Sequence, residues 1–492
     1  MASFTERYHE LTKYNPNTID KLGPVHWDSQ PPPFKAIRAQ EKIELLPALK
    51  AVMARMQEDD PSDADRPPSG LEPLAGLLFF TLGITARLGG QGQGDLFLRA
   101  APSAGGLYPT EIYVAARNQA QAGPTGGGRP ALPDGIYHYH SLKSALIPVW
   151  QGSFWADLKH YFLGDPAVDS SDLLLLFTGI YGRSAWRYKE RAYRRILLDT
   201  GHAVGNLLES CRRDGLDYAL LGGFLDEGLE ELLFLTPKEE FPLLGVALGP
   251  RGRLVHAGGQ IPGDAPAEAA RRAAPADPMQ VQQNSCERIR DPARARPRVQ
   301  GDCGAAPFEP RDFNAWRTIV QRRSCRKFTG GPMTLEQVRE CLAFAFRKEG
   351  APWCLAPGGL DFHVVALAVD GLEAGVYRLD PATLSLSAAR LGNFRSEILF
   401  LCLGQDLAAE CAFALIHTSD LAALVEAYGD RGYRYACLDA GQIGERLNLW
   451  AMHLGLGSSG IGGYYDDQGN KLLDLPLSHG ILYISLVGVP GE

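Results

Sequence analysis

The sequence predicts an α+β fold in which one domain occurs twice. Two observations indicate this: similar segments recur 240 residues apart, as Asp199 and Asp439 do, and helical patterns alternate with short strand-like runs inside each copy. Helices that surround an interrupted sheet are typical of the α+β class. A period this long indicates a duplicated domain rather than a solenoid of short repeats.

The clearest repeat relates residues 190–201 to residues 430–441, which share an arginine, a tyrosine, a second arginine, a leucine, an aspartate and a glycine at matching positions. The same offset relates three shorter segments: 135–137 to 375–377, 222–224 to 462–464, and 232–233 to 472–473. Four matches at one offset are hard to attribute to chance.

Each copy contains the same kinds of elements in the same order. Apolar spacing predicts helices, and apolar runs of four to eight residues predict buried strands. In chain order, the helices are 71–82 and 194–212 in the first copy and 335–346 and 434–454 in the second, and the strands are 110–116, 243–248, 362–369 and 481–487.

These patterns divide the chain into four parts. We expect a leader over residues 1–60, a first domain over 61–251 and a second domain over 311–492. The intervening 252–310 is rich in Ala, Pro, Arg and Gln without a sustained apolar period, which predicts a linker.

Composition excludes several classes of protein. The 492 residues are 45% hydrophobic and 22% charged, which is ordinary globular usage, and the net charge of −8 gives no general attraction to nucleic acid. No run approaches the roughly 18 apolar residues of a membrane span. The charged start lacks a secretion signal, so we expect a cytoplasmic protein. The nine cysteines include no Cys-x-x-Cys pair, and we expect neither a disulfide framework nor a metal site.

Three short motifs could carry chemistry. The run Arg322-Arg323-Ser324-Cys325-Arg326 offers guanidiniums and a hydroxyl suited to a phosphate, although such a run is more often a solvated face. The bend Pro102-Ser103-Ala104-Gly105-Gly106 could let backbone approach a flat ligand, or could be a plain turn before a strand. Gly222-Gly223 and its copy Gly462-Gly463 could present backbone N–H groups to a ligand, or could simply end a helix.

Together, in this order, the motifs resemble the nitroreductase superfamily of FMN-dependent oxidoreductases. Residues 8–14, 99–113 and 135–138 resemble its SagB-type branch, which includes azoline dehydrogenases of peptide maturation. The resemblance covers nearly the whole chain except the linker, and it implies FMN bound at a dimer interface. A duplicated chain then implies an intrachain pseudo-dimer, with further oligomerisation left open.

The resemblance also implies that the two copies are complementary. Domain one has Glu58-Asp59-Asp60 where domain two has the arginine run, and domain two has 355–361 in place of 102–108, without the serine and the tyrosine. One intact site is therefore expected. Its cofactor-binding residues are Arg322, Arg323, Ser324, Arg326, Pro102, Ser103, Ala104, Gly105, Gly106, Gly462 and Gly463.

The implied roles follow flavin chemistry. Arg322, Arg323 and Ser324 would hold phosphate and ribityl oxygens, and Arg326 would stabilise charge at the flavin pyrimidine edge. Azoline dehydrogenases carry a Lys-Tyr pair where this chain has Arg187-Tyr188, and arginine is a poor base. Tyr188 could relay a proton, although packing is the commoner role. The chain end also lacks the basic residue that relatives often place near the phosphate.

The function indicated is an FMN-dependent oxidoreductase. Its electron donor would be NAD(P)H, or oxygen would accept electrons from an oxidised substrate. Its substrate would be a quinone, a nitroaromatic or a heterocycle-bearing peptide. The alternative is a catalytically degenerate scaffold that binds flavin or peptide in a maturation complex. A third, purely structural interpretation requires the complementary motifs to be coincidence.

Overall fold

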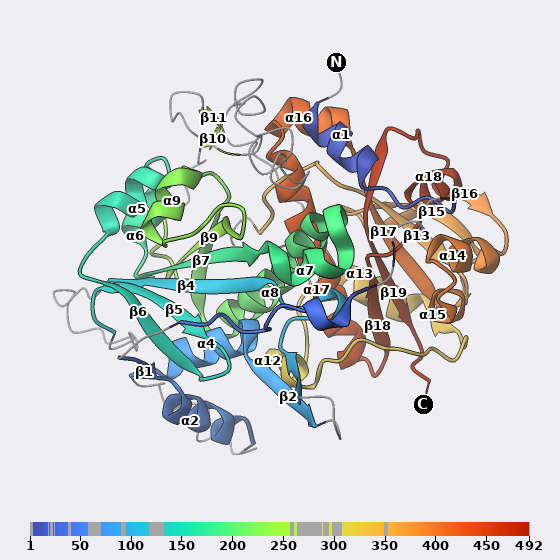
Figure 1. The fold of residues 1–492 in the computed structure, drawn as a ribbon. Helices are drawn as coiled ribbons and strands as arrows, with labels where there is room; N and C mark the ends of the chain where they lie inside the picture. Colours follow the sequence, from blue (N-terminus) through green and yellow to red (C-terminus); the bar gives the residue numbers. More distant parts are fainter. Residues whose placement is uncertain are drawn as a thin grey trace.

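The computed structural model describes residues 3–17, 19, 23, 25–37, 41–57, 70–89, 95–117, 132–255, 260–262, 288, 295–297, 308–348 and 353–491. Two helix-covered sheets lie side by side, one formed by the first half of the chain and one by the second (Figure 1). The predicted α+β class and the fusion of two similar domains are thereby confirmed. Most of the predicted linker 252–310, together with Glu58-Asp59-Asp60, lies outside the described residues.

The first sheet has the strand order β1-β6-β5-β4-β7-β9-β8, with antiparallel neighbours throughout. Its strands are β1 (Ile43–Glu44), β4 (Thr110–Ala116), β5 (Gly135–His140), β6 (Ala145–Gln151), β7 (Leu173–Ile180), β8 (Leu216–Leu221) and β9 (Glu240–Pro250). The leader contributes β1, which pairs with β6 at one edge. Part of the leader therefore belongs to the first sheet, which the sequence analysis did not anticipate.

The second sheet repeats this topology without the leader strand, in the antiparallel order β16-β15-β13-β17-β19-β18. Its strands are β13 (Asp361–Ala366), β15 (Gly375–Asp380), β16 (Ser385–Leu391), β17 (Phe413–Asp420), β18 (Gly457–Ile461) and β19 (His479–Gly488). The short strands outside the two sheets are β2 (Ile84–Gly89), β3 (Asp95–Arg99), β10 (Gln260–Pro262), β11 (Ala295–Pro297), β12 (Met333–Thr334) and β14 (Val369–Asp370).

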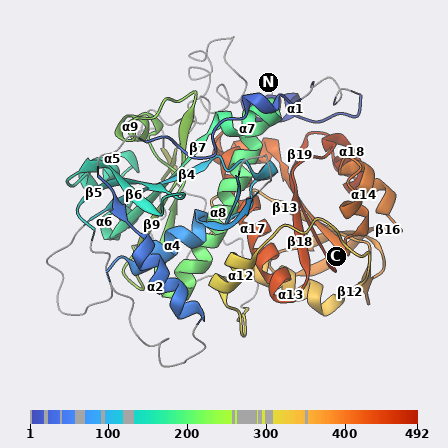
Figure 2. The same ribbon diagram turned by 60° about the horizontal axis from the view of Figure 1, so that its bottom comes forward.

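Helices cover both sheets and fill the space between them (Figures 1 and 2). The first half has α1 (Phe4–Leu11), α2 (Leu46–Gln57), α4 (Glu72–Leu82), α5 (Trp155–Tyr161), α6 (Pro166–Ser170), α7 (Tyr181–Tyr188), α8 (Ala192–Asp214) and α9 (Asp226–Leu232). The second half has α12 (Ala315–Gln321), α13 (Leu335–Ala345), α14 (Arg395–Leu401), α15 (Asp406–Glu410), α16 (Leu421–Tyr428), α17 (Gly432–His453) and α18 (Asp466–Leu473). Short 3₁₀ turns are η2 (Trp27–Ser29), η3 (Ala104–Gly106) and η4 (Lys189–Arg191).

The two long helices α8 and α17 pack against each other between the sheets. Gly201 and Gly441 lie at their contact, with Cα atoms close enough that a Cβ on Gly201 would lie 2.2 Å from the Leu438 carbonyl oxygen. Reciprocally, a Cβ on Gly441 would lie 2.4 Å from the Leu198 carbonyl oxygen. Since these residues are related by the repeat, the contact is self-complementary, as at a two-fold dimer interface.

The predicted elements agree with the structure apart from one strand. The run 362–369 was expected to be continuous, but β13 ends at Ala366, and the Leu367 and Ala368 amides both donate to the Ala412 carbonyl, at 2.8 and 2.9 Å. This irregularity interrupts the ladder, and the chain resumes as β14 beside β12.

The cysteines differ from the prediction at one described position. The sequence indicated no disulfide framework, whereas Cys354 is disulfide-bonded in the structure.

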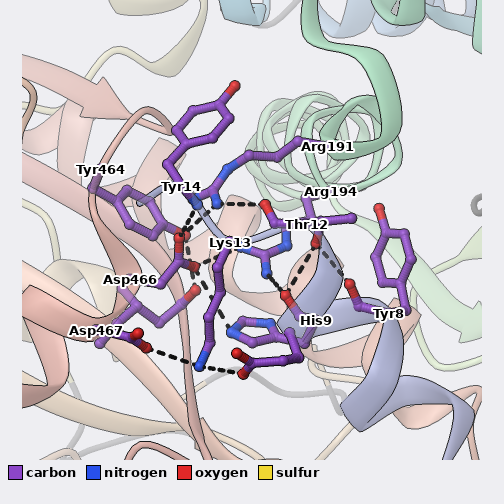
Figure 3. A network of polar contacts seen from close by, with 12 residues as sticks. Tyr8, His9, Thr12, Lys13, Tyr14, Arg191, Arg194, Tyr464, Asp466 and Asp467 are labelled. Atoms are coloured by element: carbon purple, nitrogen blue, oxygen red, sulfur yellow. Dashed lines mark hydrogen bonds and ion pairs between the residues drawn. The ribbon is translucent and has the colours of Figure 1, made fainter. Parts of the chain in front are cut away.

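The leader crosses the boundary between the two halves (Figure 3). Tyr8 packs edge-on against Tyr193 and Tyr433, which the repeat relates, with ring centroids 6.0 and 5.8 Å away. Its hydroxyl donates to the Glu190 carbonyl at 2.9 Å, while the Thr5 amide donates to the Asp430 carboxylate at 2.9 Å. The leader therefore bonds to both halves at once.

Beside the leader, Asp466 at the start of α18 binds two arginines of the other half, Arg191 at 2.6 Å and Arg194 at 2.7 Å (Figure 3). The repeat gives the reverse arrangement, in which Asp226 of the first half accepts from Arg431 at 2.8 Å. These buried ion pairs hold each domain to its copy from both directions, and nearby Arg guanidiniums hold the pKa of the Asp466 carboxyl well below its usual value.

Candidate functional site

A cavity at the boundary between the domains is lined by residues of both halves. Its lining is polar and carries two arginines, a histidine, an aspartate, an asparagine and several hydroxyls. The lining residues are Pro102, Ser103, Ala104, Gly105, Arg195, Leu198, Asp199 and His202 from the first half, and Ser324, Arg326, Gly444, Asn448, Ser458, Gly460, Gly462, Tyr483 and Ser485 from the second.

The bend before β4 forms one wall. Gly105 has a φ of +66°, in the left-handed region that favours glycine, and it turns the chain through η3. Ser103 fixes the bend from inside: its hydroxyl donates to the Asp199 carboxylate at 2.5 Å and accepts from the Tyr108 amide at 2.8 Å. The Ala104 amide adds a second bond to Asp199 at 3.0 Å.

The arginine run forms part of the opposite wall, in the loop after α12. The Cys325 amide donates to the Ser458 carbonyl at 2.8 Å, which ties this loop to β18. Arg326 is exposed and lines the cavity together with Ser324. The loop therefore presents the Ser324 hydroxyl and the exposed Arg326 guanidinium to the cavity.

The first two arginines of the run do not line the cavity. Arg322 is buried and reaches across the domain boundary, where its Nε donates to the Ala100 carbonyl at 2.9 Å. Its guanidinium also lies 3.7 Å from the Glu445 carboxylate, whose pKa burial raises to about 8. Arg323 donates to the carbonyls of Val320 and Arg322, at 3.0 and 2.6 Å. Arg322 thus positions the bend that carries Pro102 and Ser103.

Of the residues that the resemblance implied, the structure brings together Pro102, Ser103, Ala104, Gly105, Ser324, Arg326 and Gly462 around one cavity. Arg322, Arg323, Gly106 and Gly463 are not among its lining residues.

One face of α8 supplies residues that the sequence analysis missed. Arg195, Asp199 and His202 follow one another at intervals of four and three, so they share a helix face. The His202 Nδ1–H donates to the Leu198 carbonyl at 2.8 Å, and Nε2 accepts from the Tyr483 hydroxyl at 3.0 Å. Burial lowers the pKa of His202 to about 4, so this imidazole is neutral near pH 7.

The pKa of Asp199 shifts in the opposite direction to that of His202. Burial raises the pKa of its carboxyl to about 7, although the bonds from Ser103 and Ala104 and the nearby Arg195 charge act to lower it. Near neutral pH this carboxyl therefore exchanges a proton readily at the cavity wall. A group titrating near the working pH is suited to proton transfer.

Arg195 fills the space above the second-half glycine pair. A Cβ on Gly462 would lie 1.5 Å from its Nη1 atom, so any larger residue there would displace the guanidinium. A Cβ on Gly463 would meet Leu403 Cδ1 at 3.1 Å and Arg195 Nη2 at 3.9 Å. The glycine pair was expected to face a flavin, and in this structure a guanidinium lies against it.

Tyr188 lies next to the cavity, at the end of α7. A Cβ on Gly105 would lie 2.7 Å from its hydroxyl oxygen. Burial raises the pKa of the Tyr188 phenol, despite the opposing charges of Arg195 and Arg187. The phenol is therefore protonated near neutral pH and can donate a hydrogen bond.

The equivalent position on the other side of the pseudo-two-fold has different side chains. There Gly222 corresponds to Gly462 and Tyr435 to Arg195. A Cβ on Gly222 would lie 2.7 Å from the Tyr435 ring and 3.0 Å from Leu355. Tyr435 and Leu355 are both buried. Tyr435 takes the place of the Arg195 cation, and Leu355 takes the place of Pro102 in the bend that carries Ser103.

A nitroreductase family model matches the chain twice, over residues 83–250 and 319–489, which together make up more than half of it. The chain belongs to the nitroreductase family. A solved nitroreductase-family structure from Anabaena variabilis is 33% identical, covers 100% of both chains and superimposes with a TM-score of 0.86. The tandem arrangement therefore extends to a second protein of this family.

Two further relatives match shorter stretches. The Methanocaldococcus jannaschii protein MJ1384, named as a nitroreductase, is 28% identical over 163 residues, 32% of this chain and 82% of the relative. The Escherichia coli microcin B17-processing protein McbC is 24% identical over 147 residues, 30% of this chain and 52% of the relative. McbC is SagB-like, so the resemblance stated from the sequence is confirmed.

Nitroreductase-family proteins typically depend on a flavin, and the donors at this cavity suit one. A cation at Arg326 suits the negative charge of a reduced flavin ring, and hydroxyls at Ser324 and Ser458 suit phosphate or ribityl oxygens. The left-handed Gly105 shapes the bend that forms one wall of the cavity. Among the described residues no group of three His, Cys, Asp or Glu side chains is arranged for a metal ion, and no described helix is long and apolar enough to cross a membrane.

Proposed function

We propose that this protein is an FMN-dependent oxidoreductase that uses one flavin site per chain, built from both domains. The observation that carries the proposal is the asymmetry of the two related positions. One is a polar, cationic cavity lined by the Ser103 bend and the Arg326 loop, and at the other Tyr435 takes the place of Arg195 and Leu355 takes the place of Pro102.

The bound flavin would supply the redox chemistry, accepting electrons from NAD(P)H and delivering them to a quinone or nitroaromatic acceptor. Ser324 would hold phosphate or ribityl oxygens, and Arg326 would stabilise negative charge on the reduced ring. Arg322, bonded to Ala100, would keep the Ser103 bend in position rather than touch the phosphate. Tyr188, protonated near neutral pH, would donate a hydrogen bond or relay a proton beside Gly105.

Cofactor binding and turnover test this proposal. FMN titrated into the protein should bind, and R326Q should weaken binding about tenfold or more, since a charge-assisted hydrogen bond contributes roughly 1.5–3 kcal/mol. The control R339Q, at an exposed arginine of α13, should leave the affinity unchanged. The loaded protein should oxidise NADH or NADPH with menadione as acceptor.

The outcomes separate the proposal from the scaffold alternative. The similarity to McbC, a peptide-processing protein, favours that alternative. Flavin bound without turnover on either nucleotide would favour a flavin-binding scaffold of peptide maturation. Failure to bind FMN, or equal loss in R326Q and R339Q, would contradict the composite site.

A further inference from the structure

Two arginines flank Tyr188 beside the cavity. The Arg187 guanidinium lies 5.6 Å from the Tyr188 ring centroid, and the Arg195 guanidinium lies 4.8 Å from it. The local fold produces this arrangement, because α7 ends at Tyr188, Lys189 takes a φ of +50°, and α8 begins within one short turn. The end of one helix and the first turn of the next therefore meet around one ring.

Neither guanidinium forms a hydrogen bond or an ion pair within the part of the chain that the structure describes. This is costly for Arg195, which is only 5% exposed, because a buried charge is stabilised by a partner of opposite sign. The negative charge of Asp199 offsets part of the cost of burying the Arg195 charge, but the Asp199 carboxyl forms its hydrogen bonds with Ser103 and Ala104. The pair therefore has unused hydrogen-bonding capacity for an anion.

Arg195 lines the cavity, and Arg187 lies beside Gly105, which also lines it. The Arg187 Nη1 lies 3.1 Å from where a Cβ on Gly105 would be, and Arg195 lies against Gly462. Together they reach from the first-half wall to the second-half wall. An anion held between them would lie at the edge of the proposed flavin site.

An aromatic surface continues outward from Arg187. The Trp27 ring, 62% exposed, lies edge-on to Trp186 with centroids 5.5 Å apart, and Arg187 lies 5.6 Å from the Trp27 ring centroid. Exposed indole beside a guanidinium favours flat, apolar ligands that carry negative charge.

We propose that Arg187 and Arg195, which both lie near the Tyr188 ring, bind the anionic group of a planar organic substrate whose ring lies toward Trp27. This rests on the proposed function and narrows its substrate class to planar carboxylates or similar anions. The site uses Arg187 as an anion anchor at the position where azoline dehydrogenases carry a lysine, and it needs no base there.

The test compares 2-naphthoate with its neutral analogue 2-naphthamide, by calorimetry on the full chain with and without FMN. Naphthoate should bind at least about tenfold more tightly than naphthamide. R187Q and R195Q should each remove most of that preference without weakening naphthamide, since one charge-assisted bond contributes roughly 1.5–3 kcal/mol. R339Q serves as the matched control. R187Q alone suffices if R195Q does not fold, because Arg187 is only half-buried.

Four results would overturn the inference. Naphthamide could bind as tightly as naphthoate, or R187Q could weaken both probes alike. Inorganic phosphate could compete with naphthoate and lose affinity equally in R187Q, which would assign the pair to the cofactor phosphate. A shift of the flavin reduction potential in R195Q with unchanged naphthoate binding would reassign Arg195 to the flavin. Absence of FMN binding would contradict the proposed function, while the probe comparison on the flavin-free chain would still decide the anion site.

Discussion

At the scale of single residues, Asp199 links the cavity wall to the stability of the protein. Its carboxyl is buried and holds the Ser103 bend through two hydrogen bonds. Because burial raises its pKa to about 7, the folded protein keeps a proton on this group at pH values where the unfolded chain has lost it. The contribution of this carboxyl to stability is therefore full below pH 4 and falls as the pH rises to about 7.

Replacing Asp199 with asparagine should remove this pH dependence. The free energy of unfolding of D199N minus that of the wild type should rise between about pH 4 and pH 7, by roughly 1 kcal/mol per pH unit. Urea unfolding at a series of pH values measures it. D406N, at an exposed carboxylate of α15, should give a flat difference. A flat difference for D199N would show that its carboxyl ionises normally in the folded protein.

The residues of the site were predictable only where they belong to a motif. The Ser103 bend and the Arg326 loop stand out in the sequence as clusters of glycine, hydroxyl and guanidinium. Arg195 and His202 do not stand out. Their counterparts in the repeat are a tyrosine and a glutamine, so the comparison of the two copies does not single out either residue. The spacing of Arg195, Asp199 and His202 along one helix face was the available signal. That Arg322 points to Ala100 depends on the domain contact and could not be read from the chain.

At the scale of elements, the contact between α8 and α17 sets how closely the two halves approach. Gly201 and Gly441 allow backbone to meet backbone there. G201V should force the helices apart, lowering the free energy of unfolding by about 1–3 kcal/mol, as overpacking does. It should also weaken FMN binding, because both helices contribute residues to the lining of the cavity.

The control for this change is G182A on α7, where a Cβ meets nothing within 4 Å. Alanine should leave the free energy of unfolding unchanged or raise it by up to about 1 kcal/mol. Chemical unfolding and an FMN titration of both variants measure the two effects. A G201V protein as stable as G182A would mean that the helices do not hold the halves at this distance.

Most elements were predictable because their apolar patterns are strong. The strand 110–116 is β4 residue for residue, and both long helices differ from expectation by two residues or fewer at each end. The break after Ala366 arises from a shared acceptor at Ala412, and the β2–β3 hairpin follows from pairing between segments without a marked pattern. Such pairings depend on tertiary contacts rather than on local sequence.

At the scale of the whole molecule, duplication has kept the framework symmetric while the sites have diverged. Asp226 and Asp466 bind arginines of the opposite half in the same way, and the two sheets share a strand order. The related cavity positions differ, since Arg195 on one side corresponds to Tyr435 on the other. The leader adds a further asymmetry, because its strand β1 extends the first sheet to seven strands, whereas the second sheet has six.

The measurement that tests this account most directly is the flavin content of the purified, FMN-saturated protein, released and quantified per chain. The account predicts a ratio near one, because one of the two related positions is a composite cationic cavity, whereas the other has Tyr435 in place of Arg195 and Leu355 in place of Pro102. A ratio near two would show that both related positions bind flavin and would contradict the claim that the two domains share one site.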